Sequence, residues 1–113
     1  MIEGSCHCGA VGLTLPEAPV ELSSCNCSIC RRIGGLWGYY GPDQLVVQDP
    51  DDRLVGYVQG DEALTTWHCG QCGCTTHWTA RDPALERVGV NLRMFEPDVW
   101  EDLPRKHVDG AAW

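Results

Sequence analysis

The chain has 113 residues, the length of one domain, so we expect a single domain over residues 1–113. Its 16 Asp and Glu residues outnumber its 8 Lys and Arg residues, which gives a net charge of −8. An acidic chain without clustered Lys and Arg does not suit nucleic-acid binding, and no apolar run approaches the ~20 residues that span a bilayer, so neither nucleic acid nor membrane is an expected partner.

Short strands separated by turns make up most of the predicted elements. Val11, Leu13 and Leu15 alternate with small residues, which is the period-2 pattern of a half-buried strand, and Pro16 ends it. Segments rich in β-branched, aromatic and leucine residues predict further strands at residues 36–40, 45–47, 54–58, 63–68, 74–79 and 88–92. Single helical turns are predicted at residues 28–33 and 97–102. The predicted fold class is therefore all-β, with cysteines in the turns.

Eight cysteines are the unusual feature of the composition. The first residues lack the charged and apolar regions of a signal peptide, so we expect a cytoplasmic location, where clustered cysteines usually serve metal binding or catalysis. A disulfide framework is the first alternative, although eight cysteines allow 105 pairings and the sequence alone cannot choose among them. A redox Cys-x-x-Cys is the second, although such a motif normally opens a helix and the residues around positions 69–72 do not resemble one.

The cysteines fall into three motifs with the spacing of zinc ligands. They are Cys6-His7-Cys8, Cys25-Asn26-Cys27-Ser28-Ile29-Cys30 and Cys69-Gly70-Gln71-Cys72-Gly73-Cys74. A Cys-x-x-Cys turn brings two thiolates to one side, where Zn²⁺ can take both at about 2.3 Å. The glycines of the third motif give its turn the backbone freedom that it needs.

Together, in this order, the three motifs resemble those of the glutathione-dependent formaldehyde-activating enzyme family, which includes centromere protein V. The resemblance extends from Gly4 to about Leu92. It implies a β-tent fold, in which zinc staples small twisted antiparallel sheets, and two Zn²⁺ ions per chain. It also implies one structural and one catalytic zinc site, whose ligands are respectively Cys6, Cys8, Cys69 and Cys72, and Cys25, Cys27 and Cys30.

The two ligand sets differ in what they allow. Four cysteines close a tetrahedral zinc, whereas three leave one position open for water, a thiol or a carbonyl oxygen. The resemblance then implies a carbon–sulfur lyase that joins a small thiol such as glutathione to an aldehyde, with S-(hydroxymethyl)glutathione as the adduct. The alternative is a zinc-stabilised binding module or metallochaperone without catalysis, which a fourth protein ligand at the second zinc would favour.

Side chains near the second motif bear on glutathione. Arg31 and Arg32 either pair with its carboxylates or lie in a solvated turn. Trp37, Tyr39 and Tyr40 either line a pocket beside the zinc or pack in the core. The negative net charge opposes an anionic thiol at long range.

Four further residues near the motifs have open roles. Cys74 is left over once seven ligands are assigned, and it either completes the second zinc or packs as a small buried residue. His7 lies between two ligands and is expected to be structural. His68 and His77 flank the third motif and are expected to be strand residues, with a place near the open zinc as the alternative.

Overall fold

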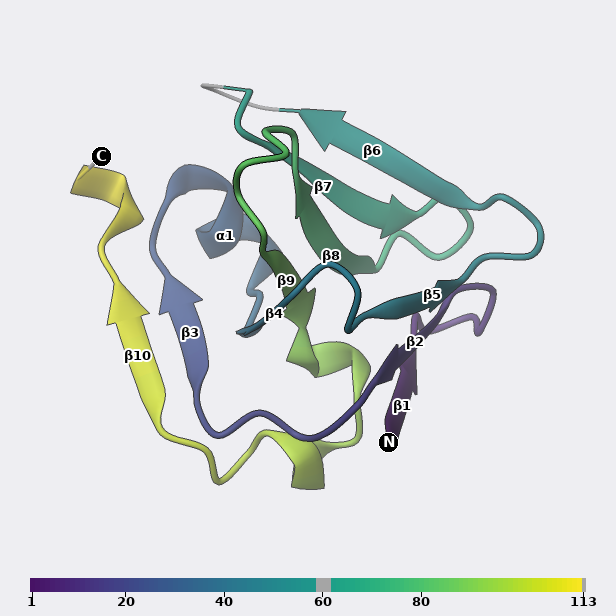
Figure 1. The fold of residues 1–113 in the computed structure, drawn as a ribbon, viewed down its shortest axis with the longest axis horizontal. Coiled ribbons are helices and arrows are strands. Elements are labelled where there is room, and N and C mark those ends of the chain that lie inside the picture. Colours follow the sequence, from purple (N-terminus) through teal and green to yellow (C-terminus); the bar gives the residue numbers. More distant parts are fainter. Residues whose placement is uncertain (59–61, 113) are drawn as a thin grey trace.

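The computed structural model describes residues 1–58 and 62–112, which form ten short strands, one α-helix and three 3₁₀ turns (Figure 1). The strands are β1 (Ile2–Ser5), β2 (Gly12–Leu15), β3 (Leu22–Cys25), β4 (Trp37–Tyr40), β5 (Val46–Gln48), β6 (Leu54–Val58), β7 (Leu64–Cys69), β8 (Thr75–Ala80), β9 (Val88–Asn91) and β10 (Arg105–Val108). The helical elements are α1 (Ser28–Ile33), η1 (Leu92–Met94), η2 (Pro97–Val99) and η3 (Gly110–Ala112). None of the described helices is long and apolar enough to cross a membrane.

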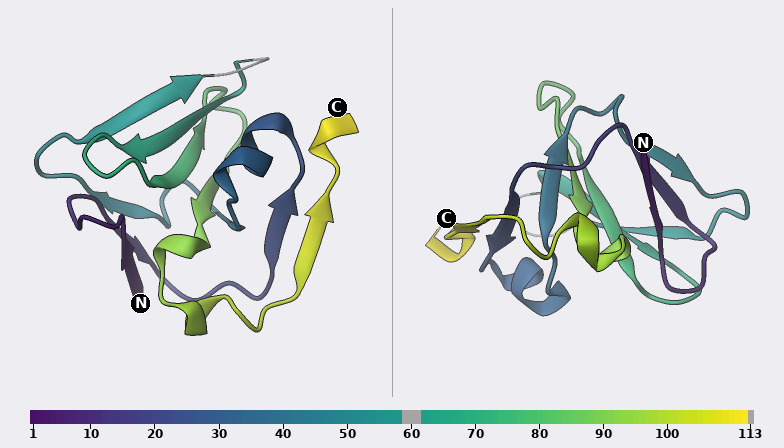
Figure 2. Two further views of the ribbon diagram at one scale, coloured as in Figure 1. Left: turned by 180° about the vertical axis from the view of Figure 1, so that it is seen from behind. Right: turned by 90° about the horizontal axis from the view of Figure 1, so that it is seen from below.

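Two sheets organise these strands. The smaller has the order β1-β2-β5, and the larger has the order β10-β3-β4-β9-β8-β7-β6. The pairs are antiparallel, apart from β10, which runs parallel to β3. Figure 2 shows the N-terminal strands and β10 on different sides of the molecule. The expected all-β fold of small antiparallel sheets, a β-tent, is confirmed.

The predicted elements have counterparts in the structure, and three strands had no prediction. Strands β1, β3 and β10 carry few apolar residues, and the exposed β10 is held mainly by its backbone ladder with β3. The predicted strand over residues 88–92 ends one residue earlier. Asn91 ends it because its side-chain oxygen accepts the amide of Arg93 and caps η1.

The core has two parts. The larger lies between the sheets and includes Leu13, Leu15, Leu22, Leu36, Val88, Val90, Leu92 and Phe95. The smaller surrounds Cys6, Val11 and Cys69. Burying these side chains stabilises the domain through the hydrophobic effect, and the smaller part places two cysteines inside the packed interior.

Candidate metal centres and the adjoining cavity

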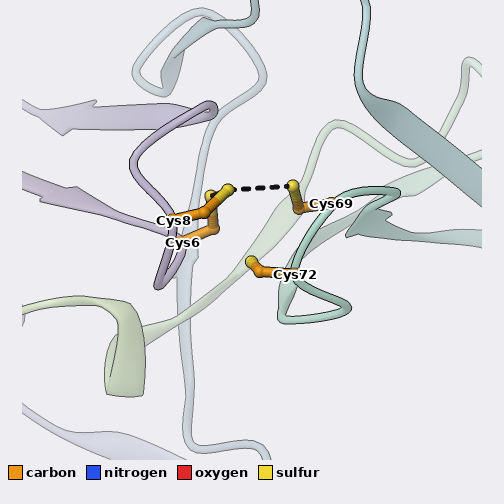
Figure 3. Close-up of side chains that lie close together, drawn as sticks. All are labelled: Cys6, Cys8, Cys69 and Cys72. Carbon is orange, nitrogen blue, oxygen red and sulfur yellow. Dashed lines mark hydrogen bonds between the residues drawn. The ribbon is translucent and has the colours of Figure 1, made fainter.

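Four cysteines converge from two loops. Cys6 and Cys8 follow β1, whereas Cys69 ends β7 and Cys72 lies in the turn before β8 (Figure 3). Their sulfur atoms all lie within 4.8 Å of one another. The sulfur of Cys8 lies 3.7 Å from that of Cys6 and 3.7 Å from that of Cys69. A tetrahedral Zn²⁺ with bonds of about 2.3 Å needs sulfur atoms about 3.8 Å apart, so this four-cysteine cluster fits the ion.

The two loops of the four-cysteine cluster are closed in the same way. In each, the amide of the first cysteine, Cys6 or Cys69, donates to the carbonyl five residues later at 3.0 Å. Each also turns on a glycine in the left-handed region, Gly9 and Gly73, both with φ of 81°. Only glycine adopts this conformation without strain, which explains why it stands at this point in both loops.

The thiols of the four-cysteine cluster do not ionise equally. Backbone amides, that of Cys74 first, hold the pKa of Cys72 at about 5 against the effect of burial. The pKa of Cys8 rises to about 11, because desolvation and contact with the other thiols outweigh the amide of Ala10. Adjacent thiolates repel one another, so full ionisation of the cluster needs a cation such as Zn²⁺.

The other three cysteines form a local cluster around the start of α1. Cys25 ends β3, Cys27 caps the helix and Cys30 lies in its first turn, with their sulfur atoms within 4.8 Å of one another. The amide of Cys30 donates to the Cys27 sulfur and the amide of Cys27 to the Cys25 sulfur, each at 3.5 Å. Among the described residues, no His, Asp, Glu or further Cys joins this three-cysteine cluster.

Cys74 lies with the four-cysteine cluster. It is half-buried against the smaller part of the core, and contact with Cys72 contributes to raising its pKa although the amide of His7 acts in the opposite direction. The thiol is therefore not placed to complete the three-cysteine cluster.

The histidines of the third motif also lie away from the three-cysteine cluster. His77 is 4% exposed, its Nδ1 lies 2.7 Å from the Thr76 hydroxyl, and its ring stacks on Trp67 with centroids 6.3 Å apart. Burial lowers the pKa of His77 to about 4, so the ring is neutral near pH 7. Neither His77 nor the half-buried His68 lines the cavity described next, and His7 is exposed.

A cavity of about 870 Å³ adjoins the three-cysteine cluster. It is lined by Cys25, Asn26, Cys27, Ser28, Ile29, Cys30, Arg31, Ile33, Trp37, Tyr39, Ala63, Leu64, Thr66, Trp78, Leu85, Arg87, Val108, Gly110 and Ala111. The volume is that of a small-molecule site, which is typically about 300–1,000 Å³. A smaller hollow of about 270 Å³ beside Glu3 and Glu96 contains no cysteine.

Among the described residues, the cavity lining carries two cations, Arg31 and Arg87, and no carboxylate, although the chain as a whole is acidic. Arg31 lines it, whereas Arg32 donates to the Ser28 carbonyl at 2.7 Å and lies outside the lining. Trp37 and Tyr39 line it as well, whereas the Tyr40 hydroxyl donates to the Glu17 carbonyl at 3.1 Å on another side. This charge pattern suits an anionic ligand.

Arg87 is a cavity residue that sequence reasoning did not single out. Its guanidinium lies 5.0 Å from the centre of the Tyr39 ring, and Tyr39 in turn contacts Trp78 at 6.0 Å between centroids. No carboxylate of the described residues pairs with Arg87. Its signal in the sequence, a single Arg before a strand, is too common to predict a site.

The segment after β10 closes one side of the cavity and was also missed. The Asn26 amide nitrogen donates to the Asp109 carboxylate at 2.9 Å, and its oxygen accepts the Ala111 amide at 2.9 Å. Gly110 packs so tightly that a Cβ there would lie 2.6 Å from the Cys25 sulfur. Since only pairing with β3 brings this segment to the cysteines, local sequence patterns do not reveal it.

Comparison with known proteins places these features in context. The family model described as "Glutathione-dependent formaldehyde-activating enzyme" matches residues 1–108. A Halomonas elongata protein, provisionally named as a glutathione-dependent formaldehyde-activating enzyme, is 48% identical over 112 residues, covering 93% of this chain and 69% of that protein. A crystal structure of a Rhodobacter sphaeroides protein superposes with a TM-score of 0.76 at 31% identity, covering 93% of this chain and all of that one.

Proposed function

Because the chain belongs to the glutathione-dependent formaldehyde-activating enzyme family, we propose that it is a zinc-dependent carbon–sulfur lyase that interconverts glutathione plus formaldehyde and S-(hydroxymethyl)glutathione. In the forward direction the thiol sulfur bonds to the aldehyde carbon, and the thiol proton passes to the carbonyl oxygen. In the reverse direction the same carbon–sulfur bond breaks.

The single observation that carries this proposal is the position of the three-cysteine cluster in the wall of the cavity. Three thiolates within 4.8 Å suit one Zn²⁺ and leave one of its four positions to a ligand from the cavity. When bound there, zinc supplies a Lewis acid that favours the thiolate form of a bound thiol. The catalytic roles proposed for Cys25, Cys27 and Cys30 are therefore those of metal ligands.

The remaining cavity residues bind and orient the thiol. Arg31 and Arg87 pair with glutathione's carboxylates, and the cavity's local positive charge acts against the long-range repulsion from the acidic chain. Trp37, Tyr39 and Trp78 supply apolar walls that limit water around the reacting atoms.

The four-cysteine cluster has a different proposed role. Four mutually close sulfur atoms leave no open position on a tetrahedral zinc. The zinc ion of the four-cysteine cluster is therefore structural and joins the two loops. We therefore propose two Zn²⁺ per chain, held by thiols that stay reduced in the cytoplasm. All eight cysteines are free in the structure.

Two-dimensional exchange NMR tests the function. Formaldehyde and glutathione form their adduct spontaneously, so the measured quantity is the increase in exchange rate when the zinc-loaded protein is added. We expect the increase with the intact protein and its loss with Cys27→Ser. The control is Cys74→Ser, which alters a thiol outside the cavity and should keep the effect. No increase from a protein that carries two zinc ions would favour the binding module without catalysis.

A further inference from the structure

The indole nitrogen of Trp37 is a buried donor without an acceptor. The residue is 2% exposed, and among the described residues no group meets the geometry of a hydrogen bond to its Nε1. Buried polar atoms are nearly always paired, so an unpaired one points to a partner that the bound state supplies or to a role at a site. Trp37 also lines the cavity beside the three-cysteine cluster.

The position of the Trp37 ring is fixed by its surroundings. In β4 the residue pairs with Ser23 of β3 on one side and Asn91 of β9 on the other. The ring lies over Gly35, where a Cβ would come 2.7 Å from the nearest ring atom and 3.2 Å from Nε1. Because strands flank the backbone and the indole needs the space left by a glycine, the N–H direction is set before any ligand arrives.

Of the three sulfur atoms in the three-cysteine cluster, that of Cys30 differs from the others in its hydrogen-bond donors. The sulfurs of Cys25 and Cys27 each accept one backbone amide at 3.5 Å. No backbone amide of the described residues donates to the sulfur of Cys30. Trp37 and Cys30 line the same cavity, and the Trp37 indole lies near enough to the Cys30 sulfur to interact with it.

We propose that the Trp37 indole N–H donates a hydrogen bond to the Cys30 sulfur in the metal-loaded protein, which makes Trp37 a positioning residue for the three-cysteine cluster. The inference rests on the proposed metal site. Groups behind metal ligands orient them and tune their electron donation, and hydrogen bonds to ligating sulfur atoms do this in metal–thiolate centres. Trp37 would supply for Cys30 what backbone amides supply for the other two sulfurs.

The first test uses the intact chain loaded with ¹¹³Cd in place of zinc. We expect two cadmium resonances, and a scalar coupling between one of them and the Trp37 indole proton, transmitted through the Cys30 sulfur. A second resonance at the three-cysteine cluster without this coupling, and without a shift of the indole proton on loading, would overturn the role of Trp37 while leaving the metal site intact. A single resonance from the four-cysteine cluster alone would overturn the proposed site itself.

The second test compares two matched variants, Trp37→Phe and Trp67→Phe. Each removes one indole N–H, but that of Trp67 donates to the Thr79 hydroxyl at 2.9 Å and does not face the cavity. We expect Trp37→Phe to weaken metal binding at the three-cysteine cluster about tenfold and to shift the thiolate-to-metal charge-transfer band of the Co²⁺-loaded protein. Equal affinities and unshifted bands in both variants would contradict the proposal. The cadmium experiment needs no variant and decides the matter if Trp37→Phe does not fold.

Discussion

The two cysteine clusters use the same donor atoms in opposite settings. In the four-cysteine cluster, Cys8 and Cys69 are 61 positions apart in sequence, and two of the four thiols are fully buried. In the three-cysteine cluster, all ligands come from one stretch of six residues, all are half-buried, and they border the cavity. A metal ion bound at the first cluster would join distant segments, whereas one bound at the second would face the cavity.

This difference predicts which cluster contributes more to the stability of the fold when it binds metal. Joining segments far apart in the chain gives the larger stabilisation, because it removes more conformational freedom from the unfolded state. A metal bound within one short loop constrains little beyond that loop. The four-cysteine cluster is therefore expected to govern stability and the three-cysteine cluster activity.

The largest expected effect comes from Cys72→Ser. Loss of this ligand should lower the free energy of unfolding by at least about 5 kcal/mol, enough to unfold most molecules of a domain with ordinary stability. Cys27→Ser should lower it far less. Thermal melts followed by circular dichroism measure both, with Cys74→Ser as the control. Equal melting temperatures for Cys27→Ser and Cys72→Ser would end the distinction between a structural and a catalytic cluster.

Gly110→Ala should affect only the three-cysteine cluster. The added Cβ would lie 2.6 Å from the Cys25 sulfur and 3.0 Å from the Cys27 Cβ, so the loop must shift. We expect roughly 10- to 100-fold weaker metal binding at this cluster with little change at the other. Competition with a chromophoric chelator measures both affinities. Gly41→Ala is the control, because its added Cβ would meet only flexible side chains. Unchanged metal affinities at both clusters in Gly110→Ala would contradict the prediction that Gly110 packs tightly against Cys25.

Arg87→Met tests the charge of the cavity. Loss of a charged hydrogen-bonding partner should raise the KM for glutathione about tenfold with little change in kcat. Arg81→Met is the matched control, because Arg81 pairs with Glu62 at 3.7 Å and does not line the cavity. Steady-state kinetics of adduct formation measure the effect. If both variants raise KM equally, the position of Arg87 in the cavity is irrelevant and only net charge matters.

The smallest expected effect is a pH dependence that belongs to neither cluster. The pKa of His77 is about 4 in the folded state and about 6.5 when unfolded, so the unfolded chain binds more protons between these values. Stability is complete above about pH 7.5 and falls by about 1 kcal/mol on going to pH 5.5. His77→Gln should lack this component, while the exposed His107→Gln should keep it. Urea unfolding at both pH values, with metal content measured in parallel, separates it from acid release of zinc. If the free energy of unfolding changes equally between the two pH values in the wild-type protein and in His77→Gln, His77 is not the source of this pH dependence.

Sequence patterns predicted the parts of this molecule that rest on local chemistry. The cysteine motifs, the helical turn at residues 28–33 and the alternating strand at β2 all depend on neighbours a few residues away, and the structure contains them. The assignment of the seven cysteines to one structural and one catalytic site remains a prediction for the experiments above to test.

What the sequence did not reveal depends on long-range pairing. Arg87 becomes a cavity residue only because β9 pairs with β4 and β8, which brings it over Tyr39. The sequence is compatible with Trp37 in a pocket wall or in the core, but its unpaired N–H is visible only when the atoms around it are known. Gly110 is an ordinary glycine in the sequence and a close neighbour of Cys25 in space.

The parallel pairing of β10 with β3 has a consequence for biosynthesis. Asn26 and Asp109, which join the two segments, are 83 positions apart, so this contact forms only after the chain as far as Asp109 has left the ribosome. The loops of the four-cysteine cluster have emerged by then, whereas the Cys25–Cys27 turn still lacks the neighbour that covers it. If both clusters bind zinc as proposed, a nascent chain stalled before β10 would capture the ion of the four-cysteine cluster and hold that of the three-cysteine cluster only loosely.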